Sequence, residues 1–144
     1  QRGYISVCDP ACGAGATLIA TVSEMKLSKY NFQNHVVFVG QDVDRVAGMM
    51  CYIQLSLLGC AGYICIGDTL TNPVTGHVLF PQEREGQELW IMPMFRIGPW
   101  AHRRLFFLLG KAGWNEYREA ERGRERFYMF FDFNDKEEKR WEKM

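Results

Sequence analysis

The stretch from Val7 to Leu18 constrains the fold of this chain more than any other. An apolar run ending at Val7 meets Asp9-Pro10, and the chain then passes two glycines, Gly13 and Gly15. Apolar residues at helical spacing follow, namely Leu18, Ile19, Val22 and Met25. This pattern predicts a strand, a tight loop and a helix. Because glycine allows a ligand close to the backbone and a helix start offers unpaired N–H groups, we predict a cofactor loop.

Two common cofactor loops do not fit this stretch. A dinucleotide loop needs a small residue at position 18, where the chain has Leu18, and a Walker loop needs Gly-Lys-Ser/Thr, which is absent. The run Asp-Pro-Ala-Cys-Gly-Ala-Gly instead resembles the S-adenosyl-L-methionine (AdoMet) loop of the DNA adenine amino-methyltransferases, including the modification subunits of type I restriction systems. The resemblance implies cofactor contacts from six residues: Asp9, Pro10, Ala11, Cys12, Gly13 and Gly15.

A second acid follows the next predicted strand. Residues 35–40 are an apolar run typical of a buried parallel strand, and Gln41-Asp42 end it. An acid at this position of a doubly wound sheet can accept the ribose hydroxyls of a nucleoside. The resemblance assigns this contact to Asp42 and places Val43 against the adenine. We predict that Asp44 caps the following helix instead.

A third acid completes the pattern. The helix is predicted to end near Gly59, and residues 61–66 read as a third strand, followed by Gly67-Asp68-Thr69. The resemblance implies that Asp68 accepts a hydrogen bond from the adenine amine and that Thr69 lies beside it. Three acids after three strands together predict AdoMet binding.

The catalytic motif of the resembled family is degenerate here. Residues 88–95 are predicted to form the next strand, and by order they occupy the place of the family's Asn-Pro-Pro-Tyr or Asn-Pro-Pro-Phe motif. The chain reads Met92-Pro93-Met94-Phe95. In the family, the Asn oxygen and the first proline carbonyl accept the amine hydrogens, while the aromatic ring stacks on a flipped base. Pro93 and Phe95 keep their roles by this match, but Met92 has no comparable acceptor.

The remaining segments give weaker signals. We expect residues 71–87 to be a long loop with His77 as a surface residue, and Gly98-Pro99 to open a helix that ends at Gly110 or Gly113. Arg103 and Arg104 are expected on the solvated face of that helix, with contact to a phosphate backbone as the alternative. Residues 126–133 read as a fifth, aromatic-rich strand.

These segments together predict one α/β domain over residues 1–144. It would comprise a cofactor half (4–70), the long loop (71–87), a degenerate substrate half (88–133) and a charged tail (134–144). The expected fold is a Rossmann-like, open and mostly parallel sheet of the AdoMet-dependent methyltransferase type, with strand order 3-2-1-4-5. The chain begins with Gln1 and not Met, so we expect it to be truncated.

Composition adds few constraints. Seventeen basic and seventeen acidic residues cancel, so net charge does not argue for or against DNA binding. Five cysteines without zinc-site spacing predict reduced thiols and no metal. We identify no signal peptide and no apolar run of membrane-spanning length, so we expect a cytoplasmic protein without a membrane partner.

Several functions are compatible with this sequence. The leading hypothesis is an AdoMet-dependent DNA adenine methyltransferase domain of a restriction-modification system, with DNA bound through a flipped adenine. A specificity subunit or a missing recognition domain would read the sequence. The alternative is a relative that binds AdoMet without transferring methyl groups and acts in regulation or interaction. A methyltransferase for RNA, protein or a small molecule shares the same cofactor half, and a nicotinamide oxidoreductase is the least favoured.

Overall fold

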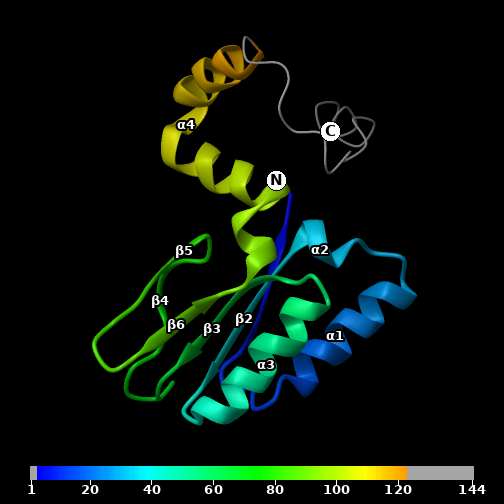
Figure 1. Cartoon of the computed structure of the whole chain (residues 1–144), viewed down its shortest axis with the longest axis vertical. Coiled ribbons are helices and arrows are strands. Elements are labelled where there is room, and N and C mark those ends of the chain that lie inside the picture. Colours follow the sequence, from blue (N-terminus) through cyan, green and yellow to red (C-terminus); the bar gives the residue numbers. More distant parts are fainter. Residues whose placement is uncertain (1–2, 123–144) are drawn as a thin grey trace. The chain divides into compact units, whose positions relative to one another are not determined.

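The computed structural model describes residues 3–122 of the chain. The chain divides into two compact units, Gln1–Leu108 and Leu109–Met144. Helix α4 (Gly98–Arg122) spans this boundary and is interrupted at Gly110, whose φ of 64° and ψ of −178° are not helical. The first helical segment therefore ends at Gly110, one of the two glycines where the sequence predicts its end, but helix resumes after it and continues to Arg122. All the strands of the described residues belong to the first unit (Figure 1).

Three parallel strands form the centre of the first unit. Strands β1 (Ile5–Asp9), β2 (Val36–Asp42) and β3 (Ala61–Ile66) pair in the order β1-β2-β3. Every residue of β3 is buried, and so is all of β2 before Asp42. Strands buried on both faces read as continuous apolar runs, which explains why the sequence predicts them well.

The fourth strand of the sheet is antiparallel. Strand β6 (Glu88–Ile91) pairs with the outer edge of β3, so the sheet order is β1-β2-β3-β6. The predicted order 3-2-1-4-5 is not confirmed, because it places this strand parallel to β1. A parallel return to β1 needs a crossover of a dozen or more residues, usually a helix, and the segment between β3 and β6, all of it described, contains no helix. The predicted strand at 126–133 lies outside the described residues.

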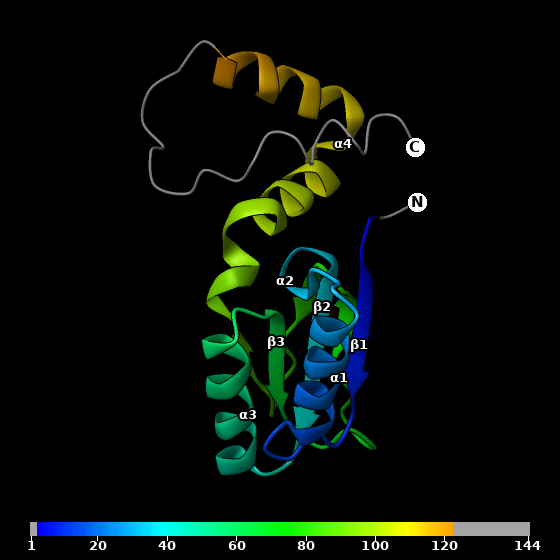
Figure 2. The same ribbon diagram turned by 90° about the vertical axis from the view of Figure 1, so that its right-hand side faces the viewer.

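Two helices cover one face of the sheet (Figure 2). Helices α1 (Ala16–Leu27) and α3 (Arg45–Leu57) follow β1 and β2, and the short helix α2 (Phe32–His35) precedes β2. Side chains alternate across a strand, so every second strand residue faces these helices. The resulting core contains Leu18, Val22, Val36, Phe38, Cys51, Leu55, Ile64 and Met92.

The opposite face is covered by the segment that the sequence predicts to be a loop. Residues 71–87 contain a two-stranded hairpin, β4 (Thr75–His77) and β5 (Phe80–Gln82), and a 3₁₀ helix, η1 (Pro93–Arg96), follows β6. Short strands with glycine and proline carry a weak sequence signal, so the pattern does not reveal the hairpin. This second core contains Val37, Val39, Ala61, Tyr63, Leu79, Phe95 and Trp100.

Candidate functional site: the carboxyl edge of the sheet

The loops after β1, β2 and β3 meet at one edge of the sheet, because parallel strands end on the same side (Figure 1). Backbone hydrogen bonds join them in pairs. The N–H of Cys12 donates to the carbonyl of Gln41 at 3.0 Å, and the N–H of Gly67 donates to the carbonyl of Asp42 at 2.9 Å. The structure therefore brings together all ten residues that the sequence assigns to the cofactor: Asp9, Pro10, Ala11, Cys12, Gly13, Gly15, Asp42, Val43, Asp68 and Thr69.

The first loop is compact and leaves the start of α1 uncapped. Asp9 Oδ1 accepts the N–H of Ala11 at 3.1 Å. Gly15 precedes α1 with a left-handed φ of 93°, and no side chain caps the helix. A Cβ atom at Gly15 would lie 2.7 Å from Sγ of Cys51 in α3. Glycine is thus required for both its backbone conformation and the close approach of α3, and the first N–H groups of α1 have no side-chain partner.

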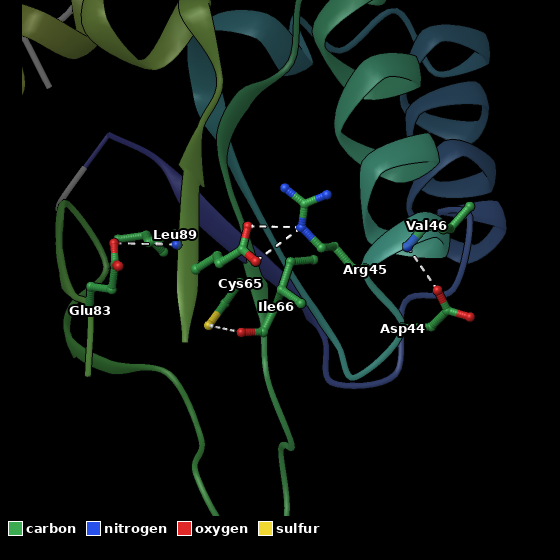
Figure 3. Close-up of polar contacts among 8 residues, drawn as sticks. Asp44, Arg45, Val46, Cys65, Ile66, Glu83 and Leu89 are labelled. Carbon is green, nitrogen blue, oxygen red and sulfur yellow. Dashed lines mark hydrogen bonds and ion pairs between the residues drawn. The ribbon is translucent and has the colours of Figure 1, made fainter. Parts of the chain in front are cut away.

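The acids after β2 divide into two roles. Asp42 Oδ2 accepts the N–H of Gly13 at 2.7 Å and its Oδ1 accepts the N–H of Asp44 at 2.8 Å. Asp44 Oδ1 accepts the N–H of Val46 at 2.7 Å (Figure 3). It also accepts the N–H of Ala47 at 3.2 Å. The prediction that Asp44 caps the helix is confirmed. Asp42 instead holds the first loop against the end of β2.

Exposed apolar surface and an ionised carboxylate lie beside Asp42. Val43 is 74% exposed. Asp68 Oδ1 accepts the N–H of Leu70 at 2.9 Å, and its Oδ2 accepts the hydroxyl of Thr71 at 2.8 Å. These bonds, the Leu70 N–H foremost, hold the pKa of Asp68 below its usual range, so it is ionised at neutral pH. The hydroxyl of Thr69 donates to the carbonyl of Pro10 at 2.5 Å, joining the third loop to the first.

Two buried glutamines at this edge are not among the residues predicted from the sequence. Gln41 is 2% exposed and Gln87 is 7% exposed, and their amides bond to the backbone of the loop after β3. The signal that could reveal Gln41 is a polar residue within an otherwise apolar strand, because a buried amide needs fixed partners.

An ion pair joins Arg45, at the start of α3, to Glu88, at the start of β6 beside the end of β3. The Nε of Arg45 donates to both carboxylate oxygens of Glu88, at 3.0 and 3.1 Å (Figure 3). Its guanidinium lies 5.4 Å from the centre of the Trp90 ring. Tyr52 packs edge-on against the same ring. Both charged side chains are largely exposed, so this pair contributes little to stability.

The degenerate motif is not brought to this edge. Strand β6 runs antiparallel to β3, so Glu88 lies beside the carboxyl end of β3 and Ile91 beside Tyr63, toward its amino end. The N–H of Met92 donates to the carbonyl of Gly62 at 3.0 Å. Met92 and Phe95 are both fully buried, in the two cores on opposite faces of the sheet. The direction of β6 thus separates Met92, Pro93 and Phe95 from the three acidic loops.

Three side chains outside the site have packing roles that differ from their predictions. His77 is half-buried in β4, accepts the N–H of Leu79 and stacks on Phe107 with ring centres 4.2 Å apart, so it is not a loop residue. The Arg103 guanidinium donates to the carbonyl of Asn34 at 2.5 Å. Arg104 lies over the rings of Phe80 and Phe95. Neither arginine lies on a fully solvated face.

The cysteines are all free thiols, and four of the five are buried. The hydrogen bond to Cys51 and burial raise the pKa of the Cys12 thiol. Within residues 3–122 no three His, Cys, Asp or Glu side chains are grouped as a metal site. No helix in this same part of the chain is long and apolar enough to cross a membrane.

The comparison with protein families identifies the chain. A family model described as N-6 DNA Methylase matches residues 2–98. The chain belongs to this family. The match covers the whole sheet and both helices beside it, and ends at the start of α4. No curated protein and no solved structure matches the chain.

Proposed function

We propose that this chain is the AdoMet-binding part of a DNA adenine amino-methyltransferase. The observation that carries the proposal is the convergence of Gly13, Asp42 and Asp68 at one edge of a parallel sheet in a member of the N-6 DNA methylase family. In open α/β sheets, ligands bind outside the carboxyl ends of the strands. The division into a cofactor half, 4–70, and a substrate half, 88–133, is part of the proposal.

The hydrogen-bond acceptors and the apolar surface at this edge fit AdoMet. Each carboxylate oxygen of Asp42 accepts one N–H and has a second lone pair, so Asp42 retains capacity for the ribose hydroxyls. Exposed Val43 offers an apolar surface to the adenine, and ionised Asp68 offers an acceptor to its amine. Bound AdoMet would supply an electrophilic methyl group for the exocyclic amine of a DNA adenine.

A second candidate function is favoured by one observation, the burial of Met92 and Phe95 away from the acidic loops. Under this alternative the chain binds AdoMet but does not transfer the methyl group, and serves in regulation or interaction. Under the first candidate, the groups that accept the amine hydrogens come from residues other than Met92, Pro93 and Phe95. A specificity subunit and a restriction-modification context belong to the first candidate only.

Calorimetric titration with AdoMet tests the cofactor site. We expect the wild type to bind and Asp42→Ala to bind at least about tenfold more weakly, since a hydrogen bond to a charged group contributes roughly 1.5–3 kcal/mol. Asp44→Ala is the matched control, because it removes an acid two residues away whose side chain caps α3. Equal affinity of the wild type and Asp42→Ala would refute the assignment of Asp42.

Transfer of labelled methyl groups separates the two candidates. The wild type is incubated with labelled AdoMet and, in parallel, with DNA, RNA or protein as acceptor. Label in the adenine amino group of DNA supports the first candidate. AdoMet binding without label in any acceptor supports the second, and label in RNA or protein alone would contradict both.

A further inference from the structure

The buried side-chain amide of Gln41, near the end of β2, forms hydrogen bonds with the backbone of the loop after β3. Gln41 Oε1 accepts the N–H of Val74 at 2.9 Å, while Nε2 donates to the carbonyl of Asn72 at 2.9 Å and to that of Gly67 at 3.2 Å. One side chain thus fixes the chain on both sides of Asp68.

A second buried amide converges on the same carbonyl. Gln87 Nε2 donates to the carbonyl of Asn72 at 2.7 Å, and Gln87 Oε1 accepts the N–H of Arg84 at 3.1 Å. Asn72 in turn donates its own N–H to the carbonyl of Asp68 at 2.7 Å. The two glutamines therefore reach the backbone of Asp68 through a single intermediate residue, Asn72.

Only an amide satisfies this arrangement at Gln41. The side chain meets two carbonyl groups and one N–H, so it must both donate and accept. A carboxylate accepts only, and an apolar side chain of similar length leaves all three backbone groups without this partner. Asp68 and Leu70 are themselves exposed, so the loop gains little order from apolar burial of its own.

We propose that Gln41 and Gln87 are positioning residues that fix the Asp68 carboxylate for the adenine amine of the cofactor. This inference rests on the proposed AdoMet site. A ligand that needs one loop conformation loses affinity in proportion to the fraction of molecules that leave it. The glutamines would therefore set the preference for adenine over a base without an amino group at the same position.

The test compares two ligands, two test variants and one control variant. Calorimetry measures binding of S-adenosylhomocysteine and of S-inosylhomocysteine, whose base has a carbonyl oxygen in place of the amine. Gln41→Met is the main test variant. Gln87→Met is the second test variant and should have a smaller effect on the two affinities. Gln33→Met is the control, because the Gln33 amide also bonds a backbone carbonyl, that of Leu58, but precedes β2 at the other end of the sheet.

We expect Gln41→Met to weaken binding of the adenosyl ligand roughly tenfold and the inosyl ligand much less, so that the ratio of the two affinities falls. Gln87→Met should shift the ratio in the same direction, and Gln33→Met should leave it unchanged. General loss of folded protein weakens both ligands by the same factor, so an unchanged ratio in Gln41→Met would overturn the proposal.

Hydrogen exchange without ligand separates this inference from the proposed function. Gln41→Met should speed exchange of the Leu70, Asn72 and Val74 amides and leave β1 and α1 unchanged. If the wild type binds neither ligand, the AdoMet site is refuted, and with it the role of the glutamines in adenine preference. Faster exchange of the loop in Gln41→Met would still show that Gln41 orders this loop. Unchanged exchange would refute the positioning role itself.

Discussion

The backbone N–H of Gly13 donates a 2.7 Å hydrogen bond to Oδ2 of Asp42, 29 residues further along the chain. The other oxygen of the same carboxylate accepts the N–H of Asp44. Asp42 therefore joins the loop after β1 to the start of α3 even without a ligand. Under the proposed function, its substitution should have two separable effects, one on the stability of the fold and one on cofactor affinity.

Asp42→Asn should lower the free energy of unfolding by about 1–3 kcal/mol in the absence of cofactor. The amide nitrogen would face one of the two N–H donors, so one charge-assisted bond is lost and a donor is left unpaired. Urea unfolding measures the effect as a lower midpoint with an unchanged slope. Asp9→Asn is the control, because Asp9 accepts the N–H of Ala11, only two residues away, in an exposed hydrogen bond, and this substitution should cost less. An equal loss in both variants would contradict the special role of Asp42.

The two loop glycines should respond differently to alanine. Gly13 has φ of 51° with no atom within 4 Å of an added Cβ, so Gly13→Ala should cost only the backbone penalty, about 1–2 kcal/mol. Gly15→Ala adds the contact with Cys51 Sγ and should cost roughly 1–3 kcal/mol more through overpacking. Thermal or urea unfolding of the two variants gives the difference.

A double variant isolates that contact. In Gly15→Ala/Cys51→Ala the clashing sulfur is gone, so the loss of stability should be smaller than the sum of the two single losses. Additive losses would mean that α1 and α3 move apart to accommodate the methyl group.

The edge that carries Asp9, Asp42 and Asp68 could be predicted from the sequence because its signals are local. Each of the three parallel strands is a short apolar run that ends in an acid, and the Asp44 cap lies directly before its helix. Glycines at 13 and 15 mark the first loop by their conformational freedom. These local signals predict where the residues lie, and the resemblance to the family implies what each of them contacts.

The placement of β6 could not be predicted in the same way. Residues 88–91 have a clear strand pattern, but pattern does not say which neighbour a strand pairs with or in which direction. A hairpin connects β3 to β6 in the structure, and its two three-residue strands are too short for a periodic signal. The buried contacts of Gln41 depend on the same segment, so they too emerge only from the folded chain.

Alkylation should distinguish Cys8 from the other cysteines. Cys8 is exposed, whereas Cys12, Cys51, Cys60 and Cys65 are buried. Burial raises the pKa of Cys60 to about 12 and that of Cys65 to about 11, so their thiolate fraction is small at neutral pH. Iodoacetamide should add once to the native protein and five times in urea, as measured by mass spectrometry.

The Cys8 reaction should also depend on pH. Although Cys8 is exposed, the partial desolvation of its sulfur and the charge of Asp9 raise the pKa of its thiol, so its rate should continue to increase above the pH at which a small free thiol levels off. Cys8→Ser should abolish native labelling. Rapid addition to two or more thiols of the folded wild type would show that the core around Cys12 and Cys51 opens readily.

Met92→Asn restores the residue that the family motif carries, but we expect it to create no methylation of DNA. Met92 is fully buried among apolar side chains. It follows β6 near the amino end of β3, whereas Asp42 and Asp68 lie at the carboxyl ends of β2 and β3. An Asn side chain there would bury an amide without a matched partner and leave space once filled by a thioether. We expect a loss of roughly 2–4 kcal/mol in unfolding free energy. Met92→Leu, which keeps the apolar contacts, should cost less than about 1.5 kcal/mol.

The decisive measurement is transfer of labelled methyl groups from AdoMet to DNA by the wild type and Met92→Asn at a temperature where both remain folded. Far-ultraviolet circular dichroism verifies folding, and Met92→Leu controls for the change in core packing. Methylation that appears in Met92→Asn alone would mean that β6 can reverse its direction and pair with β1, because only then does position 92 come to the edge that carries Asp42 and Asp68. Methylation of DNA by Met92→Asn would therefore contradict the antiparallel pairing of β6 with β3.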